Sequence, residues 1–445
     1  MISKGGQQDA AAFIPGASPI AEAGTFRFLY CRPGKGGAMM VLSLLEWQTP
    51  AKPYAINTER SSMGNIIDYL NWRGDLTFSQ APFNQIDALL LSSLSYADFG
   101  GIVPGPDDPD DEITLAAASD LFFEMHSQEE LDADKSFINW APTILRGMAG
   151  SARFKNAVLK NYIDIVDTMS SLQFSAIEII TDDGVPFISY RGTDDTVVGW
   201  KEDFNLSYMT VPAETEADQY FREVMDGRTE KVRLGGHSKG GHLAIYAVAS
   251  APELYDKVLT IYSFDGPGFN DEAMVTDHFK RVQKKVEKFI PQTSIVGRLL
   301  TSTVEPVVVK SNELGILQHN PLSWELEGKE FETLDFTDKL SDLFDETMTT
   351  WLDNMSFEER KVFVDELFSV FEASGCENIS EMTRIGIKGT KAIITRMAQI
   401  KNDSGEKVRT LVKMFFINFN VLKDNVVKEK LEDGAKLITA GKNRK

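Results

Sequence analysis

The 445-residue sequence is poor in cysteine, with only Cys31 and Cys376. Two cysteines supply neither a disulfide framework nor a zinc-ligand cluster, and such usage is typical of a reducing compartment. No apolar run approaches the roughly 20 residues that cross a bilayer. The N-terminus also lacks the hydrophobic stretch of a signal peptide. We therefore expect a cytoplasmic protein with no transmembrane segment.

Basic residues are outnumbered by acidic ones, with 46 Lys and Arg against 66 Asp and Glu and a net charge of −20. This balance, without a basic stripe, argues against a nucleic-acid partner and against tight binding to anionic membranes. The hydrophobic content of 42% is ordinary for a globular protein. The length allows two or three domains, or one large domain with an appendage.

Composition divides the chain into three zones. Residues 1–62 are rich in Gly, Ala and Pro, and the character changes at Met63, where "MGNIIDYLNW" begins. We expect residues 1–62 to be a poorly ordered extension; an ordinary small N-terminal subdomain is the alternative. Residues 63–330 alternate short β-rich runs with helical stretches, which predicts a mainly parallel sheet flanked by helices. Residues 331–445 read as a helical C-terminal region.

The predicted strands lie in "SAIEII", "PFISY", "KVRLGG", "KVLTIYSF", "KVEKFI" and "EPVVVK". The first two flank "TDDG", which predicts a hairpin turning at Asp183-Gly184. In the C-terminal region, Ser356 and Glu359 form the pattern of a capping box at the start of a helix. Apolar residues then follow at helical spacing.

One short stretch, "RLGGHSKGGHLA", joins a strand to an Ala-rich helix. Within it, Gly236-His237-Ser238-Lys239-Gly240 has the pattern G-x-S-x-G, the nucleophile elbow of α/β-hydrolases. The turn strains its serine, so the residues two before and two after must be small. The serine then faces the positive end of the helix dipole, where the N–H of Lys239 can stabilise an oxyanion. A Gly-rich structural turn is the alternative reading.

A nucleophilic serine needs a base, and His319 is the candidate. It lies in a loop after a strand, in "GILQHNPLSWEL", and it follows the serine as the chain order of this fold requires. The other four histidines are less suited to be the base. His237 is adjacent to the serine, and His242 lies one helical turn beyond it. His126 precedes the serine in the chain, and His278 falls within a predicted helix.

The triad acid should follow a strand between Ser238 and His319. Asp265 does so, in "TIYSFDGPGF". Asp271 and Glu313 are weaker alternatives. The second oxyanion donor should come from the loop after an earlier strand, and Thr193 in "YRGTDD" fits that place.

These motifs together resemble the class 3 (fungal-type) lipases. "YRGT" with "WKED", "GHSKGG", "SFDGPGF" and "HNPLSW" match successive motifs of that family. The resemblance implies Ser238 as nucleophile, His319 as base and Thr193 in the oxyanion loop. The family's acid would fall in "QTSIVGR", where Ser294 stands instead, so Asp265 rests on its position alone. "NIIDYLNWRGDLTFSQAPFNQIDALLLSSLSYADF" is similar to the N-terminal signature of the uncharacterised bacterial Mbeg-like family.

The expected protein is an α/β-hydrolase with an α-helical C-terminal appendage. We expect it to cleave a small-molecule or lipid ester through an acyl-enzyme, with no metal and no organic cofactor. Two alternatives stay open: a thioesterase or phospholipase with the same triad, and a catalytically silent hydrolase fold acting as a scaffold. The absence of an acid near His319 would favour the scaffold.

Overall fold

The computed structural model describes residues 64–334 and parts of 355–412. The first range has gaps at 109–110, 135, 168–171, 195–198, 200, 202–205, 207–209, 271–273, 295, 299, 301 and 314. The second comprises 355–376, 381, 387–400, 408–410 and 412. The predicted extension 1–62, its boundary at Met63, and Asp271 lie outside the described residues.

A single large sheet organises residues 113–309, with its strands in sequence order from one edge to the other. The strands are β1 (Ile113–Thr114), β2 (Val158–Asp167), β3 (Leu172–Ile180), β4 (Pro186–Tyr190), β5 (Val232–His237), β6 (Val258–Phe264), β7 (Val286–Pro291) and β8 (Val307–Val309). A small antiparallel pair follows, made of β9 (Leu326–Glu327) and β10 (Glu330–Phe331).

The sheet has an antiparallel and a parallel half. Strands β1 to β4 pair antiparallel, and the β3–β4 turn carries Gly184 at φ 72°, as the predicted hairpin requires. Strands β4 to β8 pair parallel, which confirms the parallel sheet predicted from the sequence. The strands β1 and β2 that extend the antiparallel half were not among the predicted ones.

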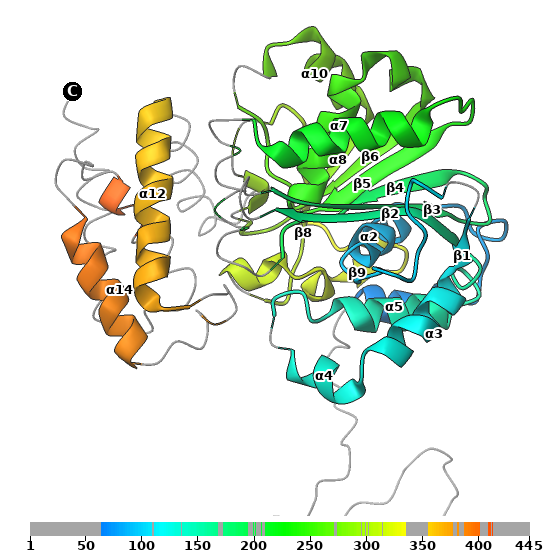
Figure 1. The fold of residues 1–445 in the computed structure, drawn as a ribbon, viewed down its shortest axis with the longest axis horizontal. Helices are drawn as coiled ribbons and strands as arrows, with labels where there is room; N and C mark the ends of the chain where they lie inside the picture. The colour runs from blue at the N-terminus through cyan, green and yellow to red at the C-terminus, as the bar shows by residue number, and fades with distance from the viewer. Residues whose placement is uncertain are drawn as a thin grey trace, which may run out of the picture. The chain divides into compact units, whose positions relative to one another are not determined.

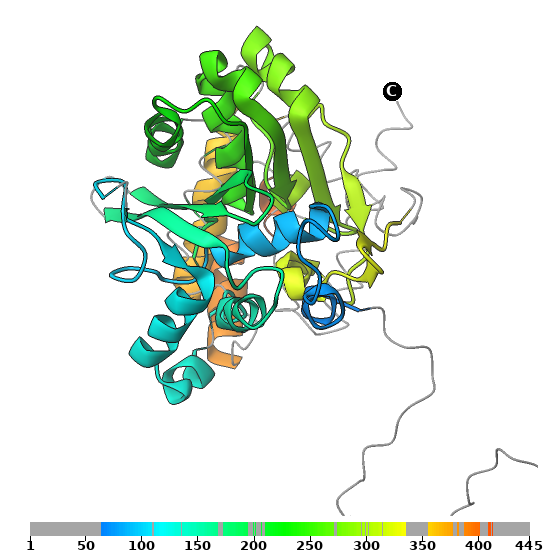
Figure 2. The same cartoon turned by 90° about the vertical axis from the view of Figure 1, so that its right-hand side faces the viewer.

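Helices cover both faces of the sheet (Figures 1 and 2). They are α1 (Ile66–Arg73), α2 (Gln85–Leu94), α3 (Leu115–Met125), α4 (Gln128–Ala133), α5 (Ala141–Ala149), α7 (Pro212–Met225), α8 (Lys239–Ser250) and α10 (Asp277–Val282). Helices α7, α8 and α10 connect successive parallel strands and lie together on one face (Figure 1). Right-handed crossovers that always step in the same direction place their helices on the same side.

Successive side chains of each strand point to opposite faces of the sheet, and they form one hydrophobic cluster on each face. Phe187 points into the cluster under α2 and α5, and its neighbour Ile188 points into the cluster under α7 and α8. Helix α2 is buried along nearly its whole length and packs across β4, β5 and β6. Its sequence "QIDALLLSSL" is apolar on almost every side, as expected of an internal helix.

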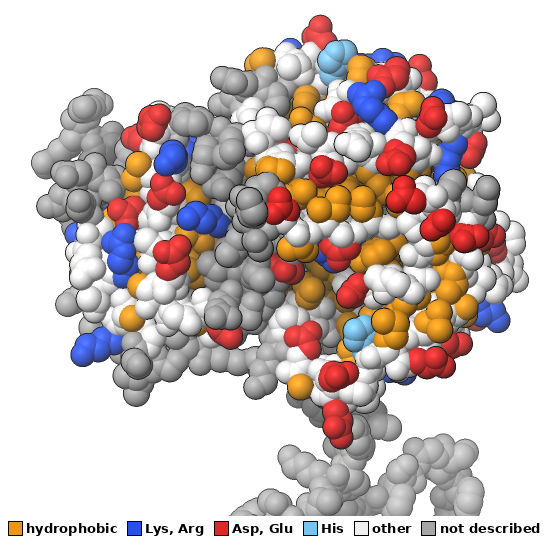
Figure 3. All heavy atoms as spheres, in the orientation of Figure 1, with side chains coloured by type: hydrophobic (Ala, Val, Ile, Leu, Met, Phe, Trp, Pro, Cys, Tyr) orange, Lys and Arg blue, Asp and Glu red, His pale blue; other side chains and the backbone are white. Residues whose placement is uncertain are grey.

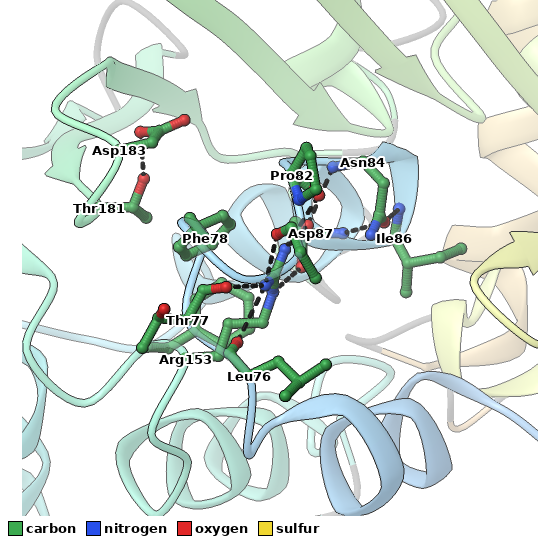
Figure 4. Close-up of polar contacts among 12 residues, drawn as sticks. Leu76, Thr77, Phe78, Pro82, Asn84, Ile86, Asp87, Arg153, Thr181 and Asp183 are labelled. Carbon is green, nitrogen blue, oxygen red and sulfur yellow. Dashed lines mark hydrogen bonds and ion pairs between the residues drawn. The ribbon is translucent and has the colours of Figure 1, made fainter.

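A buried ion pair anchors the start of α2 (Figure 4). The Arg153 guanidinium donates to both carboxylate oxygens of Asp87, at 2.7 and 2.6 Å, and neither side chain is exposed. The same guanidinium donates to the backbone carbonyls of Leu76, Thr77, Ala81 and Pro82. Because Arg153 satisfies carbonyls of the loop before α2, it ties this loop and the helix together.

Two helices are described in the C-terminal region, α12 (Phe357–Ser374) and α14 (Ile387–Gln399), and they pack on each other. The predicted capping box is confirmed: Ser356 N–H donates to Glu359 Oε2 at 2.8 Å, and Glu359 N–H donates to Ser356 Oγ at 3.3 Å. Arg396 of α14 donates to Glu366 of α12 at 2.6 Å.

The surface agrees with the acidic composition. In the face shown in Figure 3, carboxylates are scattered among basic and neutral side chains, and its coloured residues form no continuous basic stripe. Within the described ranges, every helix is too short or too polar to cross a bilayer.

Candidate active site

The backbone at Ser238 is strained. Ser238 follows β5 and is the N-cap of α8, with φ 58° and ψ −135°, a conformation that non-glycine residues rarely adopt. Strain of this kind persists where the surrounding structure holds it, and it is concentrated at functional sites. Its backbone N–H donates to the Phe264 carbonyl at 2.9 Å, which fixes the turn against β6.

The glycines flanking Ser238 provide the clearance that the turn requires. A Cβ added to Gly236 would lie 2.2 Å from the Gly240 carbonyl carbon, and one added to Gly240 would lie 2.0 Å from the Tyr190 carbonyl oxygen. Real Cβ atoms are never so close to backbone, so any side chain here would displace the turn. The sequence interpretation of G-x-S-x-G therefore holds at the level of backbone geometry.

The strand register brings Asp265 beside Ser238. His237 at the end of β5 pairs with Phe264 at the end of β6, so the residues that follow them lie side by side at the carboxyl edge of the sheet. Asp265 is itself in the left-handed region, at φ 51°, and its N–H donates to the Phe289 carbonyl at 2.8 Å.

The Asp265 carboxylate is fully buried and fully engaged. Its Oδ2 lies 2.6 Å from His319 Nδ1, and its Oδ1 accepts hydrogen bonds from Ser294 Oγ and from Gly297 N–H. Burial alone would raise the pKa of Asp265, but the hydrogen bond and charge of His319 and the bond from Ser294 outweigh it. Together they hold the pKa below its ordinary value. Asp265 is therefore a carboxylate at neutral pH.

Ser294 stands at the sequence position where the class 3 lipases that the sequence resembles would have their triad acid. Its hydroxyl bonds to the carboxylate that comes from the preceding strand, and it also accepts from Gly297 N–H at 2.8 Å. A Cβ on Gly297 would lie 2.5 Å from Asp265 Oδ1, so the loop after β7 closes tightly on the carboxylate. The loop thus keeps a polar contact at this position although it contributes no acid.

His319 ends a short 3-10 helix, Gly315–His319, and is held by the residues on either side of it. Trp324 Nε1–H donates to the Gln318 carbonyl at 2.8 Å, and the Gln318 amide donates to the Glu313 carbonyl at 2.8 Å. The loop is therefore bonded to itself, and this fixes the imidazole against Asp265.

His237 also holds this loop, through a hydrogen bond to the His319 backbone. Its Nε2 lies 2.8 Å from the His319 carbonyl oxygen, so Nε2 carries the proton and donates. Its Nδ1 then accepts from the Tyr96 hydroxyl at 3.0 Å. Burial, with the charge of His319, lowers the pKa of His237 to about 3. The ring is therefore neutral near pH 7 and too weakly basic to take the proton of the serine.

Ser238 and His319 line one pocket with about 290 Å³ of empty space. Thr193 is also part of its lining, and its remaining lining residues are largely aromatic: Tyr96, Phe137, Ile138, Trp140, Asp194 and His237. Gly192 packs so closely on the elbow that an added Cβ would lie 2.8 Å from Ser238 Cβ. Lys239 is the first residue of α8, and its ammonium donates to the Gln173 carbonyl at 3.1 Å.

Three histidines that the sequence analysis excluded as the base, and the alternative acid Glu313, do not line this pocket. His242 bonds to Glu214 and to the Gly268 carbonyl, His126 packs on Phe122, and His278 is exposed on α10. The Glu313 side chain is also exposed. Among the described residues, no group of three or more His, Cys, Asp or Glu side chains could hold a metal ion.

Sequence reasoning did not find the neighbours that complete the site. The contributions of Tyr96, Phe137 and Trp140 come from segments about 100 residues or more before the serine. The positioning contact of His237 was also missed, because adjacency to Ser238 was used only to exclude it as the base. Its only signal was the histidine inside the elbow itself.

Comparison with known proteins gives two findings. Residues 148–369 match the model of the Mbeg1-like family. Among solved structures, the chain is similar to the crystal structure of M37 lipase, with 13% identity and a TM-score of 0.31 over 57% of this chain and 83% of that chain. No curated protein sequence matches the chain. The eight-stranded sheet with its parallel half and the strand–turn–helix at Ser238 give the chain an α/β-hydrolase architecture, and the Mbeg1-like match covers about half of the chain, including this region.

Proposed function

We propose that the protein is a serine hydrolase that cleaves carboxylic esters through an acyl-enzyme intermediate. The observation that carries this proposal is the meeting of two units at one pocket: a strained Ser238 at a helix N-terminus, and an Asp265–His319 pair joined at 2.6 Å. Each unit comes from a loop at the carboxyl edge of the parallel strands, where α/β folds build their sites.

In the proposed mechanism, His319 takes the proton of the Ser238 hydroxyl as the oxygen attacks the ester carbonyl. Asp265, bonded to Nδ1, holds the tautomer that leaves Nε2 as the acceptor, and it stabilises the imidazolium that forms. The tetrahedral intermediate collapses, and His319 gives the proton to the departing alcohol. Water then repeats the sequence on the acyl-enzyme and releases the carboxylate.

The backbone N–H groups of Lys239 and Thr193 are the proposed oxyanion donors. Lys239 opens α8, so its N–H lies at the positive end of the helix dipole. Thr193 also lines the pocket, and it directly follows Gly192, which packs on Ser238. Charge that develops on the carbonyl oxygen in the transition state would meet both donors at once.

The contact between Asp265 and His319 also bears on the scaffold alternative. That alternative needs His319 to lack an acid, and the buried carboxylate on Nδ1 favours an enzyme instead.

The small aromatic pocket favours esters with short acyl groups over long-chain ones. Esters and thioesters share this mechanism, so a matched thioester series belongs in the same assay.

The test is labelling by a fluorophosphonate probe, together with hydrolysis of chromogenic acetate, butyrate and octanoate esters. The wild type should be labelled at Ser238 and should turn over the shorter esters. Ser238→Ala should abolish both, while the melting temperature changes little because only one hydroxyl is removed. Labelling at another residue, or turnover retained by Ser238→Ala, would contradict the mechanism.

A further inference from the structure

A second pocket lies between strand β7 and the helices α8 and α10, on the face of the sheet opposite to α2. Its empty space is about 320 Å³, and it shares no lining residue with the pocket of Ser238. Its walls are mostly aliphatic and aromatic, with Ile245 from α8, Phe279 from α10, and Phe269, Met274 and Val304 from the loops. Helices α8 and α10 lie on this face of the sheet in Figure 1.

One charged side chain, Lys288, lines this apolar pocket. It lies in the middle of β7, where it pairs with Ser263, and only 4% of it is exposed. Within the part of the chain that the structure describes, its ammonium has no hydrogen-bond or ion-pair partner. The carboxylate of Asp265, just after the adjacent strand β6, is close enough to attract the Lys288 charge, but it is already bonded to His319, Ser294 and Gly297.

An unpaired ammonium among apolar walls is costly for the fold. Burial lowers the pKa of Lys288 to about 8, against the attraction of Asp265 and with the help of Arg298. Near pH 7 the side chain is therefore still mostly charged, and it faces a cavity rather than a partner. An anion in that cavity would remove the cost.

The lining limits what the anion can be. Apart from Lys288, the polar side chains in the lining are Gln283 and Ser302, and their donors already bond to Met274 Sδ and to the Val304 carbonyl. The ammonium is therefore the one charged donor of the lining, and it suits a carboxylate through a charge-assisted hydrogen bond. The remaining walls suit a short hydrocarbon chain, which would contact Phe269, Met274 and Phe279. The enclosed space is small, which favours a small ligand over a long-chain one.

We propose that this pocket is a binding site for a short-chain aliphatic monocarboxylate, with Lys288 binding the carboxylate and Phe269, Met274 and Phe279 enclosing the chain. Nothing in this proposal depends on ester hydrolysis at Ser238. The site is distinct from the catalytic pocket, so the two can be tested separately.

Thermal unfolding with butyrate is the first test, with butyramide as an uncharged ligand of the same shape. Lys288→Met removes the ammonium and keeps a flexible apolar chain. Lys284→Met is the matched control, because Lys284 is an exposed lysine four residues away. Saturating butyrate should raise the melting temperature of the wild type and of Lys284→Met by about 2–5 °C. It should leave Lys288→Met unchanged, and butyramide should have no effect on any of the three.

A second measurement on the wild type keeps the proposal testable if Lys288→Met does not fold. Reductive dimethylation at pH 8 is followed by peptide mass spectrometry at Lys288 and Lys284. Butyrate should protect Lys288 at least fivefold and leave Lys284 unprotected, relative to chloride at equal ionic strength. Equal effects of butyrate and chloride, an equal thermal shift in Lys288→Met, or no shift in the wild type would each overturn the proposal.

Discussion

Two buried carboxylates in this protein each bond to a basic side chain, yet their surroundings differ. Asp87 meets Arg153, whose other donors are taken up by four backbone carbonyls, so the pair is closed on every side (Figure 4). Asp265 meets His319, whose ring lines a pocket. A guanidinium only donates hydrogen bonds and keeps its protons, whereas an imidazole has one nitrogen that can accept a proton and one that can donate it. The first pair therefore suits holding a fold, and the second suits moving a proton.

The same substitution at the two carboxylates separates these roles. Asp265→Asn should lower kcat about 10³- to 10⁴-fold, because an amide at Nδ1 favours the wrong imidazole tautomer. The loss should appear in kcat more than in KM, since substrate is not expected to contact Asp265. Steady-state hydrolysis of a butyrate ester measures this. Turnover within tenfold of wild type would exclude Asp265 as the acid.

Asp87→Asn should act on stability instead. It leaves the Arg153 guanidinium buried without its counter-charge, which typically costs about 3–5 kcal/mol of unfolding free energy. Urea unfolding monitored by circular dichroism measures the loss. The kcat of the protein that remains folded should stay within twofold of wild type. A large loss of kcat with unchanged stability would reverse the distinction drawn between the two pairs.

The support beneath His319 predicts a smaller effect. His237→Phe removes the hydrogen bonds to the His319 carbonyl and to Tyr96 but keeps an aromatic ring. Because His319 would be held less firmly, the activation free energy should rise by about 1–2 kcal/mol. This would lower kcat roughly 5- to 30-fold, with KM little changed. His237→Asn, whose amide can still donate to the carbonyl, should recover part of the rate. A purely structural role would lower the melting temperature in both variants and leave kcat of the folded protein unchanged.

The smallest effect is expected at Ser294. Ser294→Ala removes one of two donors to Asp265 Oδ1, and Gly297 N–H remains. We expect about a fivefold loss of kcat, equivalent to roughly 1 kcal/mol.

Ser294→Ala should also change the stability of the fold in acid. The folded-state pKa of Asp265 lies below its unfolded value of about 3.9, so its stabilisation is complete above pH 4 and is lost as pH falls through the folded pKa. Without Ser294 that pKa rises, and the acid-unfolding midpoint should move to higher pH. An unmoved midpoint would mean that Ser294 does not stabilise the charged carboxylate.

Much of the site is local in sequence, which is why it could be predicted. The strand, the turn and the helix from Val232 to Ser250 follow from glycine spacing, because only glycine allows the backbone approaches found at Gly236 and Gly240. Asp265 could be predicted from chain order and strand ends alone, and its bond to His319 agrees with that prediction. The roles assigned to Ser238, Asp265, His319, Lys239 and Thr193 stay predictions until activity is measured.

The sequence by itself determined the elbow and the capping box at Ser356, since each depends on residues a few positions apart. The parallel sheet was predictable from the alternation of strands and helices along the chain. Only the tertiary structure decided which partners surround the site. Several of these contacts join distant segments: Ser294 Oγ bonds to Asp265, His237 bonds to the His319 carbonyl and to Tyr96, and Arg153 bonds to Asp87. Such contacts depend on how whole layers pack, because a side chain's partner is set by strand register and helix placement rather than by its neighbours in the chain.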